Sequence, residues 1–550
     1  MSNNELFLFT KDRSSSLRHG ASAAVVNNHI IVIGGYCDNN NNGKSDNNNS
    51  IFLNLQCIDI NSADYISCLV TTSNAHNRCY HSSSVANINN NNKIYVFGGL
   101  IKLNGILNIS QDILEVEYNR FGIFAEPLQC SSKPLVGRYG LTSHAFGDKL
   151  DRIIIYGGIN ELNANKSSAA TAANSVGTTT STSATTATNA ATSAKTMNAN
   201  VTGFKCSSDV VVFNPSNATA AATTSSSAAA ATAVDTSLVK ISIEGTDKPV
   251  DRAFHSSCIC GSNSNLLVVY GGQAENKALL NDLWILDLTE IVNAINNGVP
   301  LVADVPTTAT APPTKGSKNT PVVTTPIPVA RWYRVLTTAD NLICSPRYMH
   351  TSYAVTENAT GNVEFYVFGG VGSKGPMSLS RQYRCMIKRI DVGKYSGNSF
   401  EVIDAIGHED LDINYTIHSA YALPLIDIST VTTTTPAGII ILGGDRSHIS
   451  SSSITRFEYV SNDLYIQPLM KESSLINRIL STIEERNRSN VIRSNTDINK
   501  SHHIEYPNGD IYDGLVLYRD DQPTDIPQGF GKMLYVDGGI YEVCLTVCYI

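Results

Sequence analysis

The sequence is poor in charged residues and has no large excess of either sign. Charged residues make up 16% of the 550 residues, against roughly 25% in an average globular protein. The formal net charge is −8. A charge this small over this length gives no electrostatic attraction to nucleic acid or to anionic membranes. We therefore expect no nucleic-acid partner.

Long apolar segments are also lacking. The longest purely apolar runs have about five residues, far below the roughly 18 that a membrane-spanning helix needs. Residues 1–5 read MSNNE, with no basic region followed by an apolar stretch, which is unlike a secretory signal. We expect a cytoplasmic protein without a transmembrane segment.

The 12 cysteines are scattered, and no two are spaced as Cys-x-x-Cys. The closest are Cys258 with Cys260, and Cys544 with Cys548. A zinc site needs paired ligands at recurring spacing, so we expect no metal and no cofactor. Without a secretory signal, we expect reduced thiols that behave as small apolar residues.

Six runs of bulky apolar residues, each ending in two glycines, organise the chain. Each run is β-branched or aromatic without alternation, which favours a strand buried on both faces. The glycines let the chain turn where a side chain would clash. Such regular repetition indicates a repeat architecture. The pairs are Gly34 and Gly35, Gly98 and Gly99, Gly157 and Gly158, Gly271 and Gly272, Gly369 and Gly370, and Gly443 and Gly444.

An arginine precedes five of these runs, with a histidine beside it or up to six residues on. The pairs are Arg18 and His19, Arg78 and His81, Arg138 and His144, Arg252 and His255, and Arg347 and His350. The sixth run has His418 but no matching arginine. Because these arginines and histidines recur at a similar place in each repeat, we expect them to have a structural role. We expect the histidines to hydrogen-bond within each repeat, and the arginines to bind carboxylates or backbone carbonyls.

Two tryptophans extend the pattern downstream of the fourth run. Trp284 lies in an apolar segment, residues 281–287, that has an acid near its start, and Trp332 lies in the aromatic-led segment 331–335. The order of these features resembles the kelch motif. In that family each repeat forms one four-stranded blade of a β-propeller. The resemblance covers residues 5–469 and implies an all-β, six-bladed kelch β-propeller.

A propeller must close its ring of blades. Residues 5–10 read as a short strand with no repeat of its own, and no fourth strand follows residues 464–466. We expect this N-terminal strand to complete the sixth blade and so remove the open sheet edges.

Three low-complexity segments lengthen the repeats beyond the roughly 50 residues of a compact kelch repeat. Residues 163–200 and 216–237 are mostly Ala, Thr, Ser and Asn, and residues 299–330 are rich in Pro and Thr. Such compositions lack the apolar content that offsets the entropy of ordering. We expect disordered insertions within the propeller.

The remaining sequence predicts a helix and a second type of repeat. Apolar spacing over residues 472–488 favours a helix inside a linker at 470–500. Residues 501–550 resemble the MORN motif, which implies β-hairpins, since Asn-Gly and Asp-Gly between aromatic strands are strong hairpin signals. The motif positions are Tyr506, Gly509, Tyr512, Gly514, Gly529, Gly531, Tyr535, Gly538 and Tyr541.

The second MORN-like copy departs from the pattern, because Val543 stands where a glycine is expected. Two repeats are too few for an independent solenoid, in which stacked neighbours supply the core. Three alternatives stay open: a truncated chain, a wrongly assigned end, or hairpins that dock elsewhere.

No catalytic motif is present. The sequence has no Gly-x-x-x-x-Gly-Lys-Ser/Thr and no Gly-x-Ser-x-Gly, and its single Gly-x-Gly-x-x-Gly, residues 370–375, runs into Pro376 and not into a helical pattern, so we predict no catalytic residue. We expect a non-catalytic scaffold or adaptor that binds protein partners through the propeller. The tail would serve assembly or association with a membrane or the cytoskeleton, although its acidic character argues against lipid binding by charge.

Two alternatives follow from the kelch resemblance. Copper radical oxidases of the galactose oxidase type use a kelch propeller with two Tyr, two His and a cross-linked Cys, but no such set can be matched position by position here. A substrate adaptor of a ubiquitin ligase would carry a BTB or F-box region, and no room remains for one before residue 18.

Overall fold

The computed structural model describes the chain from residue 7 to residue 545, with gaps. The described residues are 7–10, 20–37, 50–51, 55–60, 65–66, 68–73, 75–103, 106–128, 136–164, 201–218, 237–299, 301, 327–337, 345–356, 360–373, 375–376, 383–391, 398–407, 415–418, 421–425, 438–442, 445–448, 459–460, 464–469, 473–481, 502–519, 522–534 and 540–545. They form two compact units, Met1–Ser473 and Ser474–Ile550.

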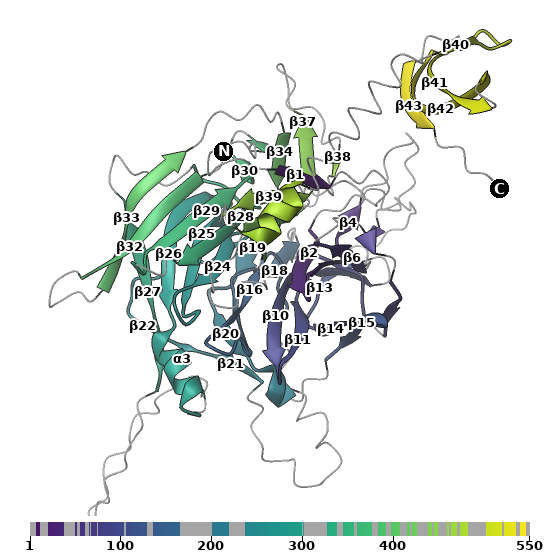
Figure 1. Cartoon of the computed structure of the whole chain (residues 1–550). Coiled ribbons are helices and arrows are strands. Elements are labelled where there is room, and N and C mark those ends of the chain that lie inside the picture. Colours follow the sequence, from purple (N-terminus) through teal and green to yellow (C-terminus); the bar gives the residue numbers. More distant parts are fainter. Residues whose placement is uncertain are drawn as a thin grey trace, which may run out of the picture. The chain divides into compact units, whose positions relative to one another are not determined.

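Strands dominate both units, which confirms the predicted all-β class (Figure 1). The helices of the described residues are α3 (Thr289–Asn296) and the short segments 215–218 and 474–481. Among the described residues, no helix has the length and apolar character to span a membrane.

Six groups of four antiparallel strands repeat one plan in the first unit, and a Gly-Gly run supplies the second strand of each group. The groups are β2 (Ser22–Val26), β3 (His29–Ile33), β6 (Leu55–Asp59) and β7 (Tyr65–Ile66); β10 (Ser82–Ile88), β11 (Asn91–Phe97), β14 (Ile113–Asn119) and β15 (Gly122–Pro127); β16 (Thr142–Phe146), β17 (Arg152–Tyr156), β20 (Val210–Phe213) and β21 (Leu238–Lys240); β24 (Ser256–Cys260), β25 (Leu266–Ala274), β26 (Leu279–Asp287) and β27 (Val329–Leu336); β28 (Thr351–Thr356), β29 (Val363–Phe368), β32 (Tyr383–Asp391) and β33 (Asn398–Gly407); and β35 (Tyr421–Leu425), β36 (Gly438–Leu442), β39 (Leu464–Pro468) and β1 (Phe7–Thr10).

Shorter strands extend these groups, most of them as small hairpins after the Gly-Gly pairs. They are β4 (Tyr36–Cys37) with β5 (Ser50–Ile51); β12 (Leu100–Leu103) with β13 (Ile106–Ile109) and β9 (Arg78–Cys79); β18 (Ile159–Ala164) with β19 (Val201–Cys206); β23 (Arg252–Ala253) with β25; β30 (Val371–Gly372) with β31 (Gly375–Pro376); and β34 (Tyr415–His418) with β37 (Asp445–His448) and β38 (Tyr459–Val460). β8 (Val70–Thr72) adds a parallel strand beside β15.

The first strands of the six groups contact one another in a closed series. β2 contacts β10 and β35, β10 contacts β16, β16 contacts β24, β24 contacts β28, and β28 contacts β35. These strands lie in the middle of the first unit (Figure 1). Among the described residues, the first strand of a group pairs with the second strand of the same group and with no other strand, as β10 pairs with β11 and β16 with β17. The other edge of each first strand therefore turns toward the centre of the series. The arrangement is propeller-like.

The N-terminal strand β1 belongs to the sixth group. It pairs antiparallel with β39, with Phe7 opposite Ile466. This is the pairing expected from the sequence, and it joins the two ends of the first unit through a backbone ladder.

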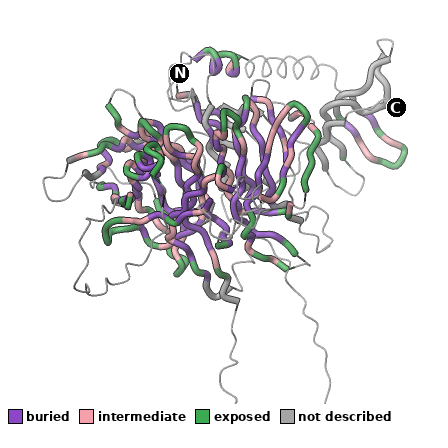
Figure 2. The backbone as a smooth tube through the Cα atoms, turned by 90° about the horizontal axis from the view of Figure 1, so that it is seen from below, coloured by how far each residue is buried: buried purple, intermediate pink, exposed green. Residues whose placement is uncertain are grey.

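The apolar core lies between neighbouring groups. Ile94, Val96 and Phe97 of β11 are fully buried, which agrees with the lack of alternation in the Gly-Gly runs. One core cluster joins Ile154 and Val212 of the third group to Val269 of the fourth. The buried residues of the first unit follow its strands through the interior (Figure 2).

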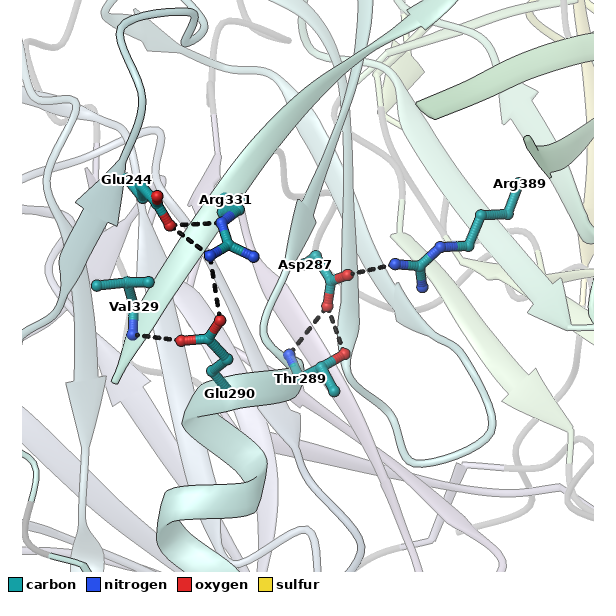
Figure 3. A network of polar contacts seen from close by, with 7 residues as sticks. All are labelled: Glu244, Asp287, Thr289, Glu290, Val329, Arg331 and Arg389. Atoms are coloured by element: carbon teal, nitrogen blue, oxygen red, sulfur yellow. Dashed lines mark hydrogen bonds and ion pairs between the residues drawn. The ribbon is translucent and has the colours of Figure 1, made fainter. Parts of the chain in front are cut away.

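β27 links three neighbouring groups at their outer strands. It pairs antiparallel with β26, and parallel with β22 (Ser242–Glu244) and with the end of β33. A polar network surrounds the start of α3 at this place (Figure 3). The Arg331 guanidinium lies 2.5 Å from Glu244 and 3.3 Å from Glu290. Arg389 of β32 lies 3.0 Å from Asp287, at the end of β26.

The insertions are shorter at their edges than predicted. Asn163 and Ala164 end β18, residues 216–218 are helical, and Val329 and Ala330 begin β27. Strand pairing orders Asn163, Ala164, Val329 and Ala330, although their composition alone favours disorder. The rest of the three insertions lies outside the described residues.

The second unit contains the helical segment 474–481 and one antiparallel sheet. Leu475, Ile476 and Ile479 of the helix are buried, and the helix lies inside the predicted range 472–488. The sheet has the order β40 (His502–Glu505), β41 (Ile511–Arg519), β42 (Gln522–Leu534) and β43 (Ile540–Leu545).

Candidate binding face and central cavity

Four arginines of the repeat are buried, and each binds its own Gly-Gly turn. In each, Nη1 donates to the carbonyl of the first glycine, and Nε donates to the carbonyl two residues upstream. The Nη1 bonds are Arg78 to Gly98 (3.1 Å), Arg138 to Gly157 (3.3 Å), Arg252 to Gly271 (3.0 Å) and Arg347 to Gly369 (2.8 Å). Burial lowers the pKa of Arg78 to about 10. These side chains fix the turn and are not open to a ligand.

Arg252 also makes a bidentate ion pair with Asp282. The two nitrogen–oxygen distances are 2.8 and 2.7 Å, and the Trp284 indole donates to the same carboxylate at 2.7 Å. Burial favours a higher pKa for Asp282, but the bonds and charge of Arg252 outweigh it and lower the pKa.

The two tryptophans serve the core. Trp284 and Trp332 are buried and meet edge to face, with ring centroids 6.5 Å apart. Both pack in the cluster between the third and fourth groups.

The first four Gly-Gly pairs also bind the next group, each through the amide of the second glycine and the carbonyl of the next repeat's arginine. Gly98 and Gly99 have φ values of +64° and +97°, and a Cβ at Gly98 would lie 2.0 Å from the Arg138 carbonyl oxygen. The Gly99 amide donates to that same oxygen at 2.9 Å. The pair is therefore needed both for backbone conformation and for close approach. Gly443 and Gly444 lie outside the described residues.

The histidines do not behave as the sequence predicts. His144 Nε2 lies 2.8 Å from Ser257 Oγ, and His255 Nε2 lies 2.9 Å from Thr142 Oγ1. Both bonds cross from the third group to the fourth, so the prediction of bonds within each repeat is wrong for these residues. The repeat pattern does not show which strand lies beside each histidine.

His144 also occupies a different place from the other histidines. His81, His255 and His350 stand three residues after their arginines, whereas Leu141 holds that place after Arg138. His144 lies further on, within β16. Grouping it with the other three was wrong. Arg18 and His19 lie outside the described residues, and His418 is the last residue of β34.

Burial keeps these histidines neutral. It lowers the pKa of His81 to about 3, with a further contribution from the Arg78 charge, and lowers that of His144 to about 4. It also lowers the pKa of His255 and His350, each again beside its arginine.

A backbone ring joins the repeats at the residue two positions after each arginine. Its members are Gly20, Tyr80, Gly140, Phe254 and Met349, all with φ between +52° and +66°. From Tyr80 on, the amide of each member donates to the carbonyl of the member before it, at 2.6, 2.9, 2.8 and 2.9 Å in turn, so the described bonds form an open arc of this ring. A left-handed conformation costs a non-glycine residue about 1–3 kcal/mol and often marks a functional site.

Aromatic side chains gather at this backbone ring. Phe254 contacts Tyr80, Tyr139 and Tyr348, with centroid distances of 5.6, 5.8 and 6.4 Å. A Cβ at Gly140 would lie 2.9 Å from the Phe254 ring, so glycine makes room for it. Glycine at Gly20 makes the same room for Tyr80.

Exposed aliphatic residues lie near these aromatics in the chain. Val136 and Val250 each precede a buried arginine by two residues and are 57% and 53% exposed. The hairpin of β12 and β13 carries the exposed Ile106 at its tip. We call this end of the first unit, defined by the backbone ring with Tyr139, Tyr348, Val136 and Val250, the ring face.

A cavity of about 640 Å³ runs between the first strands of the groups. Its lining extends from Gly20, Tyr80 and Phe254 of the backbone ring to Asn87, Leu150 and Ser264 near the strand turns. No Asp, Glu, Lys or Arg lines it among the described residues. Polar lining side chains include Ser22, Ser82, Ser83, Ser84, Thr142, Ser143, His144, Ser256, Ser257, Cys258, Cys260, Thr351, Ser352, Tyr353 and Thr356.

Hydroxyl groups of the lining bridge neighbouring first strands. Ser82 Oγ lies 2.8 Å from Ser143 Oγ, and Ser83 Oγ donates to the Ala23 carbonyl at 3.3 Å. On the other side of the fourth group, Thr356 Oγ1 accepts from the Gly261 amide at 2.7 Å. The wall of the cavity is therefore held by polar bonds between groups.

Within the part of the chain that the structure describes, no three His, Cys, Asp or Glu side chains are placed to hold a metal ion. The cysteines there are free thiols, and burial raises the pKa of Cys260 to about 12.

The MORN-like positions lie in the sheet of the second unit. Tyr512 is buried and packs with Ile504 and Tyr506, and Gly509 takes φ +90° in the turn before β41. Gly514 lies opposite Gly531 in the ladder of β41 and β42, Gly529 lies in β42, and Tyr541 lies in β43. Tyr535 and Gly538 lie outside the described residues.

The backbone ring and the cavity lining were missed in the sequence. The ring residues stand at a constant offset from the arginines, and this offset was visible. The serine runs Ser82–Ser84 and Ser256–Ser257 are the sequence signal of the cavity lining.

Comparisons with known proteins support the repeat assignment at one place. The kelch motif matches residues 17–51, which contain the first Gly-Gly pair. No sequence match to a curated protein is found.

Two solved structures resemble the fold loosely. The structure of YjhT shares 11% identity, with a TM-score of 0.42, over 82% of this chain and 94% of that chain. A chain of RAG in complex with one melted and one unmelted RSS shares 11% identity, with a TM-score of 0.43, over 85% of this chain and all of that chain. Likenesses this loose support no statement about function.

Proposed function

We propose that the first unit is a six-bladed kelch β-propeller that acts in the cytoplasm as a non-catalytic platform for a protein partner. The partner binds the ring face. The observation that carries this proposal is the group of partly buried rings around Phe254, together with the exposed Val136 and Val250 beside two of the buried arginines in the chain. The kelch motif at residues 17–51 supports the blade assignment.

The ring face suits a protein partner better than the opposite end of the strands. Aromatic residues are enriched at protein interfaces and supply most of their hot spots. At the opposite end, two hairpins turn through Asn27 and Asn28, and through Asn89 and Asn90. The exposed Leu150 and Phe121 also lie in turns at that end, but among the described residues neither belongs to a group of packed rings. The small hairpins that follow the Gly-Gly pairs add further contact surface to the ring face.

The second unit would extend this platform. Its four-stranded sheet and the buried Tyr512 are compatible with two MORN-like hairpins. We propose that the tail serves assembly, or association with a membrane-proximal or cytoskeletal structure. The acidic Asp510 and Asp513 favour protein contacts over anionic lipid.

Affinity capture with surface variants of the full chain tests the platform. The double variant Val136→Asp and Val250→Asp places two charges on the ring face without touching the core. We expect this variant to lose a partner that the unchanged chain captures, because charge in an apolar interface is costly. The matched control is Phe121→Asp, an exposed apolar residue (63%) in the turn between β14 and β15.

The outcome distinguishes the surfaces. Loss in the double variant and retention in the control supports the ring face. Equal retention in both rejects it. A third protein that ends at residue 469 tests the first unit without the tail. If this protein captures no partner, the tail is the binding module and the proposal is wrong.

A further inference from the structure

We propose that the central cavity binds a small, uncharged, polyhydroxylated ligand, which is to say a neutral sugar or polyol. The cavity shares the backbone-ring residues, Tyr80 and Phe254 among them, with the ring face, but the proposal does not depend on a protein partner there. The cavity's size, its lack of charge and its fixed hydroxyl groups lead to this conclusion.

The size of the cavity fits a small molecule. Its volume of about 640 Å³ lies within the range of roughly 300–1,000 Å³ that ligand pockets occupy. Its lining comes from the first strands of five groups as well as Leu423 of the sixth. A ligand would therefore contact residues that strand pairing holds in place before it arrives.

The lack of charge selects the class of ligand. A charged ligand leaves water and needs a partner of opposite sign, and the desolvation cost is large where none is present. The described lining has no acidic or basic side chain of that kind. Burial also keeps His144 and His255 neutral. A neutral ligand avoids this cost.

Fixed hydroxyl groups give the cavity its hydrogen-bonding capacity. A hydroxyl donates once and accepts twice, so one bond within the wall leaves capacity for a ligand. The Ser82–Ser143 and Thr142–His255 bonds hold their hydroxyls in position. Held in this way, the groups lose little side-chain entropy when a ligand binds.

The strand edges add backbone groups. Along its second edge a first strand such as β10 has no ladder partner among the described residues, since its pairing is with β11 alone. Such an edge presents alternating donors and acceptors. Ligand hydroxyls are both donors and acceptors, so they can satisfy either kind of group.

Aromatic rings line one end of the cavity. Tyr80 and Phe254 belong to the lining and pack edge to face with each other. The C–H face of a sugar ring is apolar, and an aromatic face offers it large contact area. Hydroxyl-rich walls and an aromatic end together match a ligand with a polar rim and an apolar face.

Calorimetry with the purified full chain tests the proposal. The probes are glucose, maltose, cellobiose and sorbitol, with glucuronate and glucosamine as charged counterparts of glucose. We expect a dissociation constant in the millimolar range or below for at least one neutral probe, and about tenfold weaker binding of both charged probes. Binding of no neutral probe at about 20 mM, or tighter binding of a charged probe, overturns the proposal.

Two variants locate the site. Ser83→Phe fills the cavity from β10 and should abolish binding of the neutral probe. Phe121→Ser changes a turn that does not line the cavity and should bind as the unchanged chain does. Unaltered binding by Ser83→Phe, with a thermal melt like that of the unchanged chain, places the ligand elsewhere and overturns the proposal. If Ser83→Phe does not fold, Tyr80→Ala takes its place and should weaken binding at least about tenfold; unaltered binding there rejects the cavity.

Discussion

Buried arginines are the residues on which the repeats of the first unit depend. Each donates to two backbone carbonyls, and Arg252 adds the bidentate pair with Asp282. A buried charge without partners is costly, so these bonds are a condition for the burial of the guanidinium. The contacts of one arginine thus bind the start of a repeat, its Gly-Gly turn and its third strand.

Removal of the Asp282 carboxylate should destabilise the first unit. In Asp282→Ala, Arg252 stays buried without its counter-charge, and we expect a loss of about 3 kcal/mol in the free energy of unfolding. Chemical denaturation measures it. The control is Glu244→Ala, which breaks the exposed pair with Arg331 and should cost less than about 1 kcal/mol. Equal losses in the two variants contradict the role of the buried pair.

Buried histidines should make the protein sensitive to mild acid. The folded-state pKa of His81 is about 3, below the 6.5 of the unfolded chain, so the unfolded state binds more protons between these values. The stability contributed is full above pH 6.5 and is lost as pH falls toward 3. Asp282, whose pKa is also lowered, loses its contribution only below its usual 3.8.

We therefore expect the midpoint of chemical denaturation to move to a lower denaturant concentration when the pH is lowered from 7 to 5. The variant His81→Gln should show a smaller fall, because it has no group to protonate at this place. An identical pH dependence in the variant and the unchanged chain excludes His81 as a source.

At the scale of the element, the strand end with two glycines is the joint between neighbouring groups. The Gly98 and Gly99 backbone lies against the Arg138 carbonyl of the following repeat. Side chains are absent there because the next group occupies the space.

Gly98→Ala should therefore be severely destabilising. Its Cβ would lie 2.0 Å from the Arg138 carbonyl oxygen, and we expect a loss of more than about 3 kcal/mol. Gly147→Ala is the matched control, since φ is also positive (+80°) but no heavy atom lies within 4 Å. It should cost about 1 kcal/mol from backbone strain alone. Similar losses would show that strain, and not contact between groups, determines the need for glycine.

Structural features that depend on residues of one repeat could be predicted from the sequence. Contacts between residues of different repeats could not. The apolar runs and Gly-Gly turns depend on neighbours in the chain. The bond from His255 to Thr142 joins residues 113 positions apart, and no local pattern reports which strand lies there. Composition likewise assigns Asn163 and Ala164 to an insertion, but they pair in β18 with residues of β19 nearly forty positions on.

At the scale of the whole molecule, the two ends of the first unit meet in one sheet. β1 lies beside β39, so the sixth group contains strands from both ends of the unit. An open edge at this place would expose unpaired backbone groups and invite association between chains.

Removal of residues 1–10 should therefore cause association and lower the thermal midpoint. Light scattering after gel filtration measures the association. Removal of residues 1–4 leaves β1 intact and serves as the control, which should stay like the unchanged chain. A monomeric, equally stable 1–10 deletion would mean that β1 is not needed for closure.

The central claim is that a partner occupies the ring face. A photo-cross-linking amino acid placed at Val250 in the cell, and at Phe121 in a parallel protein, tests it most directly. We expect one cross-linked partner from position 250 and none of that partner from position 121. Cross-linking of the partner from position 121 and not from position 250 would contradict it.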